Sequence, residues 1–239
     1  MKGLSRRDWL KSASLTSGLA LLGGNGIISS LSAEEIRKFN PRPLVGPIRL
    51  GSNENPYGPS ESMRKAMVAA FENSCRYPWT YNASLVKMIA EKEGVPENYI
   101  VPVAGSTEGL KVAGITFGQG GEIITCAPTF LSMMEYAELW GTEINWVSLT
   151  KDLDFDLDEI EKRVSAETKL VFLCNPNNPT GKVYTREELE FIADLCKEYD
   201  VLCFTDEIYE HLTFDDNVFT SILAEVPGLA DTCVILNGV

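Results

Sequence analysis

The segment Leu170-Val171-Phe172-Leu173-Cys174-Asn175-Pro176-Asn177-Asn178-Pro179-Thr180-Gly181 joins an apolar run to a turn of asparagine, proline and glycine. An apolar run of this length, bounded by turn residues, is typical of a strand that is buried on both faces. A second run, Val201–Thr205, leads in the same way into Asp206-Glu207-Ile208-Tyr209. Both segments therefore place polar side chains at the point where a buried strand ends.

Similar apolar runs alternate with helical patterns along the chain. The predicted strands are Ile100–Val103, Glu122–Cys126, Ile144–Leu149, Leu170–Cys174, Val201–Thr205 and Cys233–Leu236. The predicted helices are Ser60–Glu72, Ala83–Glu93, Ser106–Phe117, Phe130–Leu139, Leu157–Val164 and Glu187–Tyr199. This order predicts an α/β fold with a mostly parallel sheet, each strand buried on both faces. Ligands of such sheets bind outside the carboxyl ends of the strands, so the loops there are the candidate site.

Composition excludes several classes of partner. The chain has 239 residues, of which 44% are hydrophobic and 23% charged, with a formal net charge of −13. An acidic protein of this kind repels nucleic acid and anionic membrane surfaces, so an anionic ligand must be held by local donors.

The six cysteines show no C-x-x-C pair, and the chain has a single histidine, His211. A zinc site is therefore not expected, and we predict no metal. Cys126, Cys174, Cys203 and Cys233 lie inside apolar runs and are predicted to be core residues.

The N-terminus carries the pattern of an export signal. Ser5-Arg6-Arg7-Asp8-Trp9-Leu10-Lys11 resembles a twin-arginine motif, and residues 12–31 are too weakly apolar to span a membrane. We predict a twin-arginine signal peptide over residues 1–33 and a periplasmic or other extracytoplasmic location. The alternative is an amphipathic N-terminal helix with a chance arginine pair. Residues 34–59, rich in proline, glycine and asparagine, are predicted to form an extended N-terminal arm.

Three strand-end positions carry residues suited to binding chemistry. Asp206 ends an apolar run, where a carboxylate is costly unless it is paired with a cation or caps the following turn. Gly105-Ser106-Thr107 opens a predicted helix, so its N–H groups and hydroxyls suit an anion, although serine and threonine are also common helix caps. Phe130 is either a flat ring facing a ligand or a core phenylalanine.

Asn175–Gly181 and Asp206–Tyr209, in this order, resemble the fold-type I pyridoxal-phosphate aminotransferases, and the resemblance covers residues 48–239. It implies that the α/β sheet is the three-layer large domain of that fold and that the cofactor is pyridoxal 5′-phosphate. In that family an aspartate in the position of Asp206 pairs with the protonated pyridine nitrogen. The resemblance implies that Asn178 and Tyr209 donate to the 3′-oxygen of the ring.

The same resemblance implies roles for the other strand-end residues. Phe130 is expected to stack on the pyridine ring, and Gly105, Ser106 and Thr107 are expected to cradle the phosphate.

Two matches to the family lie nearer the N-terminus. Arg76-Tyr77-Pro78 resembles the segment whose tyrosine reaches the phosphate of the neighbouring subunit, which implies a homodimer with Tyr77 supplied by the partner subunit. Leu50–Pro59 resembles the substrate-side arm of the histidinol-phosphate aminotransferase branch and implies that Asn55 and Tyr57 face the substrate. The later segments Asp206–His211 and Ile235–Val239 resemble aspartate aminotransferase relatives more closely, so the substrate is not carried over.

The chain departs from the family pattern at its C-terminus. Leu236-Asn237-Gly238-Val239 resembles the lead-in to a Ser-Lys pair, which would place the Schiff-base lysine two positions past Val239. The arginine for the substrate carboxylate and the C-terminal small domain are also absent. The resemblance therefore implies a truncated large domain over residues 60–239, and this 239-residue chain is expected to be inactive alone.

The expected reaction of the complete enzyme is transfer of an amino group between an amino acid, or an amino-phosphate, and a 2-oxo acid. Two alternatives remain open on these residues: a pyridoxal-phosphate-dependent decarboxylase or β-lyase of the same fold, and a non-catalytic pyridoxal-phosphate-binding protein.

Overall fold

The computed structural model describes residues 51–55 and 57–238. The chain divides into two compact units, residues 1–88 and residues 89–239, and each is described by itself. The predicted signal peptide and most of the predicted arm lie outside the described residues, and the predicted domain limits stay predictions. No helix in the described part combines the length and the apolarity needed to cross a membrane.

The first unit is helical where it is described. Helix α3, Glu61–Ala70, begins after Ser60, whose hydroxyl accepts a hydrogen bond from the Met63 amide at 3.2 Å and caps the helix. A 3₁₀ turn, Phe71–Asn73, follows, so the predicted helix Ser60–Glu72 is confirmed as helical, with its last residues in the 3₁₀ turn. Helix α4, Trp79–Glu93, continues into the second unit and begins four residues before the predicted start. Helix α3 buries none of its side chains.

The second unit is built around a five-stranded parallel sheet in the order β2-β1-β3-β4-β5. Its strands are β1 Glu122–Ala127, β2 Glu143–Ser148, β3 Thr168–Cys174, β4 Leu202–Asp206 and β5 Cys233–Leu236. Its main helices are α5 Ser106–Gly118, α6 Ser132–Leu139, α7 Leu157–Arg163 and α8 Arg186–Tyr199. The short helix α9, Ile222–Glu225, and the 3₁₀ turns Glu97–Tyr99 and Pro227–Thr232 were not predicted.

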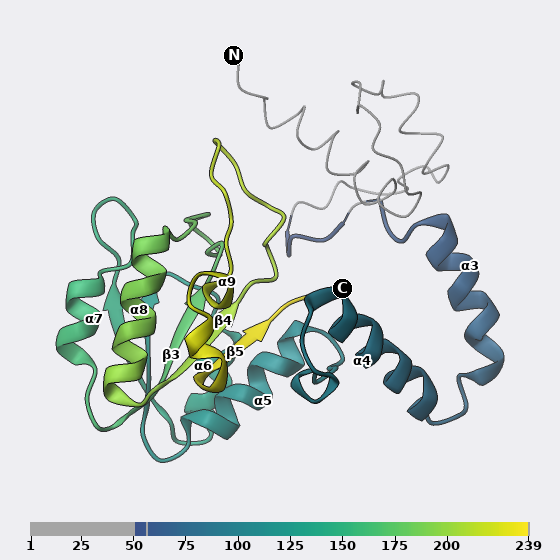
Figure 1. The fold of residues 1–239 in the computed structure, drawn as a ribbon, viewed down its shortest axis with the longest axis horizontal. Coiled ribbons are helices and arrows are strands. Elements are labelled where there is room, and N and C mark those ends of the chain that lie inside the picture. Colours follow the sequence, from purple (N-terminus) through teal and green to yellow (C-terminus); the bar gives the residue numbers. More distant parts are fainter. Residues whose placement is uncertain (1–50, 56, 239) are drawn as a thin grey trace. The chain divides into compact units, whose positions relative to one another are not determined.

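Helices cover both faces of the sheet, which gives the three layers expected of the α/β fold (Figure 1). On one face, Ile124 of β1 and Val171 of β3 pack in a core with Ile160 of α7 and Ile192 of α8. On the other, Phe172 of β3 belongs to a core with side chains of α5, α6 and β5, among them Leu110, Met133, Met134 and Leu236. The alternation of neighbouring strand residues between two cores explains why the strands have continuous apolar sequences.

Two sequence predictions of strand structure are wrong. The segment Ile100–Val103 forms no strand, and Val101 is largely exposed, because no neighbouring strand pairs with it in the described sheet. Strand β2 is at an edge of the sheet and leaves Trp146 partly exposed, so it is not buried on both faces as predicted.

The predicted core cysteines are confirmed for three of the four positions. Cys126, Cys174 and Cys203 are fully buried free thiols. Cys233 is half-buried on β5, because that strand also lies at an edge of the described sheet.

Candidate active site

The carboxyl ends of three strands lie level with one another. In the sheet register Asp206 at the end of β4 lies between Cys174 of β3 and Leu236 of β5. The Asn175 amide donates to the Asp206 carbonyl at 2.9 Å, and the Glu207 amide donates to the Leu236 carbonyl at 2.8 Å. The loops that follow these strands therefore start from one edge, as the parallel order predicts.

Asp206 is a buried carboxylate that lacks a cationic partner within the described ranges. Its side chain is 2% exposed, and its Oδ1 accepts a hydrogen bond from the Ile208 amide at 3.3 Å. Burial raises the pKa of Asp206 to about 6, and the hydrogen bond from Ile208 offsets only part of this shift. A cation placed against this carboxylate would remove the cost of its burial.

Asn178 and Tyr209 meet although 31 residues separate them in the sequence. The Asn178 side-chain amide donates to the Tyr209 hydroxyl, with Nδ2 and the hydroxyl oxygen 3.5 Å apart. Both side chains are half-buried. The backbone of Asn178 is held in turn, because its amide donates to the Cys174 Sγ at 3.4 Å. Two hydrogen-bonding groups thus point to one place from the loops after β3 and β4.

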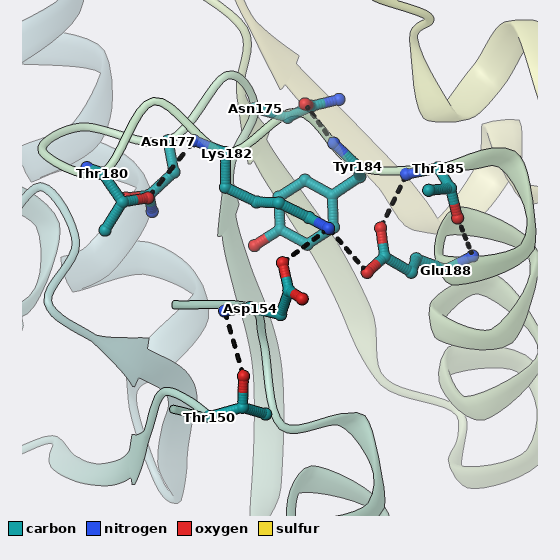
Figure 2. Close-up of polar contacts among 9 residues, drawn as sticks. All are labelled: Thr150, Asp154, Asn175, Asn177, Thr180, Lys182, Tyr184, Thr185 and Glu188. Atoms are coloured by element: carbon teal, nitrogen blue, oxygen red, sulfur yellow. Dashed lines mark hydrogen bonds and ion pairs between the residues drawn. The ribbon is translucent and has the colours of Figure 1, made fainter. Parts of the chain in front are cut away.

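The loop after β3 is anchored by two buried asparagines that our sequence analysis did not single out. The Asn175 Oδ1 accepts from the Tyr184 amide at 3.2 Å (Figure 2), and its Nδ2 donates to the Thr220 carbonyl at 3.2 Å. Asn177 donates from Nδ2 to the Thr129 hydroxyl at 3.3 Å and so ties this loop to the loop after β1. The sequence did contain a signal for them, because Asn175 and Asn177 belong to the same heptapeptide as the predicted site residue Asn178.

A second buried carboxylate follows Asp206. Glu207 is 2% exposed, and its Oε1 accepts from the Thr205 hydroxyl at 3.3 Å. Burial raises the pKa of Glu207 to about 7. The sequence reasoning missed this residue, since a glutamate after a strand is ordinarily exposed.

Phe130 lies in the loop after β1, directly after the buried Thr129. It is half-buried and packs against the core on the α5 and α6 face of the sheet. One part of the ring is therefore fixed by the core, and its stacking on a cofactor stays a prediction.

Gly105, Ser106 and Thr107 form the start of α5, as predicted, although no strand precedes them. Gly105 has a φ of +93°, a backbone conformation in which a residue with a side chain would be strained. The first turn of α5 lies close to the end of β5, because a Cβ on Gly109 would come 2.7 Å from the Leu236 Cδ1. The N-terminus of α5 is thus brought to the same edge of the sheet as Asp206.

The remaining predicted residues belong to the first unit. Asn55 closes a turn, with its Oδ1 accepting from the Tyr57 amide at 3.0 Å. Tyr77 is 82% exposed and stacks on Trp79 with ring centroids 5.6 Å apart. Their roles toward substrate and toward the partner subunit stay predictions.

The donor set of the second unit fits pyridoxal phosphate. The buried carboxylate of Asp206, which has no cationic partner among residues 51–55 and 57–238, suits a protonated ring nitrogen, and the Asn178–Tyr209 pair suits a phenolic oxygen. The N-terminus of α5 suits a phosphate.

Known proteins share this architecture. A histidinol-phosphate aminotransferase of Bacillus velezensis is 32% identical over 170 residues, which is 71% of this chain and 47% of that protein. A solved putative histidinol-phosphate aminotransferase from Erwinia carotovora atroseptica is 28% identical, with a TM-score of 0.72 over 80% of this chain and 56% of that one. Cystalysin from Treponema denticola, whose structure contains a pyridoxal 5′-phosphate cofactor, shares the fold at 18% identity, with a TM-score of 0.70 over 90% of this chain and 58% of that one.

The chain spans about half the length of the curated relatives it matches. The family described as aminotransferase class I and II matches residues 45–239, which is most of the chain and includes the whole strand-end site. On that extent of similarity, this chain belongs to the class I and II aminotransferases.

Proposed function

We propose that the protein, in its complete form, uses pyridoxal 5′-phosphate to transfer an amino group between an amino acid, or an amino-phosphate, and a 2-oxo acid. The observation that carries the proposal is the hydrogen bond from Asn178 Nδ2 to the Tyr209 hydroxyl at 3.5 Å, together with the buried Asp206 carboxylate at the end of β4. Membership of the aminotransferase family supports the same reaction.

Bound pyridoxal phosphate supplies an electron sink that stabilises negative charge at the substrate Cα. Asp206 would hold the ring nitrogen in its protonated form, because the buried carboxylate is stabilised by that positive charge. Asn178 and Tyr209 would donate to the 3′-oxygen from two directions and so fix the rotation of the ring in its plane. Phe130 would cover one face and exclude water from it.

Gly105, Ser106 and Thr107 would bind the phosphate through amide and hydroxyl donors at the start of α5. The acidic chain offers no general attraction for an anion, so these local donors carry the phosphate contact.

We also infer a homodimer in which Tyr77 serves the partner subunit. The first unit exposes large apolar side chains, among them Phe71 (75%), Tyr77 (82%) and Trp79 (74%), and helix α3 buries none of its residues. Such a surface is costly in water and is typical of one that a second subunit covers. Sedimentation equilibrium of the complete protein tests this, since a monomer at micromolar concentration contradicts it.

The experiment that tests the reaction is product analysis with the complete native protein and added pyridoxal phosphate. Histidinol phosphate, which the names of several relatives suggest, and aromatic amino acids are offered with 2-oxoglutarate as acceptor. Glutamate formed in step with loss of the amino donor supports the proposal. Release of CO2, or of pyruvate from a thiol-bearing amino acid, contradicts it in favour of a decarboxylase or β-lyase. No turnover with any donor points to a non-catalytic binding protein.

We further propose export by the twin-arginine route, on the motif Ser5–Lys11. That route carries folded proteins, which suits a protein that takes up its cofactor before export. Changing Arg6 and Arg7 together to lysine is expected to retain the protein in the cytoplasm, as measured by cell fractionation. Equal distribution of the variant and the wild type contradicts the proposal.

A further inference from the structure

The tip of the loop after β3 is a short arc, residues 178–181, that is closed at its base by Asn177 and Lys182. The Asn177 amide donates to the Lys182 carbonyl at 2.8 Å, and the Gly181 amide donates to the Asn177 carbonyl at 2.8 Å. Inside the arc, the Asn177 Oδ1 accepts from the amide and the hydroxyl of Thr180 at 3.2 and 3.0 Å. The position of Asn178 therefore depends on the position of this base.

The side chain of Lys182 connects the base of the arc to two other elements (Figure 2). Its Nζ lies 2.7 Å from the Asp154 Oδ1, in the connection between β2 and α7, and 3.0 Å from the Glu188 Oε1, in the first turn of α8. The side chains of Lys182 and Glu188 are each 19% exposed, so salt screens this pair less than it screens a surface pair.

The Glu188 carboxylate has a second partner, and the backbone of Asp154 is held by a hydrogen bond. Glu188 completes a capping box with Thr185, whose amide donates to the Glu188 Oε2 at 2.6 Å and whose hydroxyl accepts from the Glu188 amide at 3.2 Å. The Asp154 amide donates to the Thr150 hydroxyl at 3.2 Å. The ammonium group of Lys182 thus bridges a carboxylate held in a capping box and one on a hydrogen-bonded turn.

Lys182 stays charged in this setting. Burial acts to lower its pKa, but the hydrogen bonds and negative charges of Asp154 and Glu188 outweigh burial and raise the pKa above the ordinary value. Without the ammonium, the Asp154 and Glu188 carboxylates would repel each other, and the base of the arc would lose its tether to both elements.

We propose that Lys182 is a positioning residue, whose ion pairs with Asp154 and Glu188 hold the 178–181 arc so that Asn178 stays directed at the Tyr209 hydroxyl. The proposal rests on the proposed function for the role of Asn178, but the ordering of the arc by Lys182 does not need a bound cofactor.

The first test is hydrogen exchange of the complete protein without cofactor, comparing Lys182→Met with Lys162→Met. Lys162 also pairs with a glutamate, but at 3.6 Å and with its side chain 70% exposed, so it is a matched control. We expect amides of residues 175–184 to exchange about tenfold faster in Lys182→Met, while β3 and the control variant are unchanged. Exchange equal to that of the wild type overturns the proposal.

The second test follows the pH at which the visible absorption of bound pyridoxal phosphate changes, a property that a donor to the 3′-oxygen controls. Lys182→Met is expected to move this pH in the same direction as Asn178→Ala, and the double variant is expected to move it no further. Lys182→Arg should restore most of the wild-type value, because the arginine can still bridge the two carboxylates. An unmoved midpoint in Lys182→Met overturns the proposal.

A further variant guards against loss of folding. Asp154→Asn keeps Lys182 and the capping box intact, and Asp154 is partly exposed, so this variant should fold and show a smaller change in both measurements. If the wild type shows no cofactor absorption at all, the proposed function fails, whereas the exchange experiment still decides the role of Lys182.

Discussion

The residues proposed to hold the cofactor fall into two regions that are built differently. On the ring side, Asp206 is buried, and Asn178 and Tyr209 are held by loops that start from neighbouring strands. On the phosphate side, Gly105 and Thr107 are exposed and depend on a single helix terminus.

This difference implies a division of labour. Ring-side groups lie at the carboxyl ends of paired strands or in the loops that follow them, so changing one should disturb the electronic and geometric control of the reaction. Phosphate-side groups supply additional hydrogen bonds from an open turn, so changing one should weaken binding and leave the chemistry intact.

The largest effect is expected from Asp206→Asn, which keeps the shape of the ring-side site but removes its charge. The ring nitrogen would no longer be held protonated, and kcat/KM should fall by about 10³-fold. Steady-state kinetics of the complete, cofactor-loaded protein measure this. Asp194→Asn, at a position with a largely exposed side chain, serves as the control. Activity of the Asp206 variant within tenfold of the wild type would contradict the assigned role.

Without cofactor, the buried carboxyls of Asp206 and Glu207 should make the protein more stable in mild acid than at neutral pH. Burial raises the pKa of Asp206 from 3.8 to about 6 and that of Glu207 from 4.5 to about 7, so the folded state binds more protons between these values. The free energy of unfolding should therefore fall as the pH rises from about 4 to about 7. At about 1.4 kcal/mol per pKa unit, the shift of each carboxyl lowers the free energy of unfolding by roughly 3 kcal/mol over this pH range.

Urea unfolding at a series of pH values measures this dependence. Asp206→Asn should remove about half of the fall, and bound pyridoxal phosphate should remove a similar part by supplying a positive charge to Asp206. An Asp206→Asn variant whose stability depends on pH in the same way as that of the cofactor-free wild type would contradict the raised pKa of Asp206.

A smaller effect is expected from Asn178→Ala and Tyr209→Phe, each of which removes one ring-side donor. Each should lower kcat by about tenfold, which corresponds to the loss of one hydrogen bond to a charged oxygen. Because the two side chains contact each other at 3.5 Å, the double variant should lose less than the product of the two single losses. Kinetics of the wild type, the two single variants and the double variant measure this coupling. If the double variant loses the full product of the two single losses in kcat, the two side chains act independently.

On the ring side, the sequence predicted that the strand-end residues meet at one edge of the sheet, while their roles toward the cofactor stay predictions. Asn178, Asp206 and Tyr209 each follow a buried apolar run, and parallel strands bring such positions to one edge. Lys182, Asp154 and Glu188 were not predicted as a group, because their contact depends on three separate elements and no short motif records it.

The fold shows the same limit. The run Cys233–Leu236 is a strand with the predicted bounds, whereas the apolar run Ile100–Val103, which contains Pro102, is not a strand. An apolar run makes a strand possible, but only a neighbour to pair with makes it one, and that neighbour is a non-local property. The phosphate-side turn was predicted correctly as a helix start, but its preceding strand was not.

The smallest effect is expected on the phosphate side, where Ser106→Ala removes one hydroxyl from the first residue of α5. The dissociation constant of pyridoxal phosphate should rise about fivefold, since a single hydrogen bond contributes about 1 kcal/mol. The kcat at saturating cofactor should not change. Ser132→Ala is the matched control, because Ser132 is the first residue of α6 and is also half-buried. Fluorescence titration measures the dissociation constant of pyridoxal phosphate, and steady-state kinetics at saturating cofactor measure kcat. A fall in kcat at saturation would mean that this turn also positions the ring, and the division between the two regions would not hold.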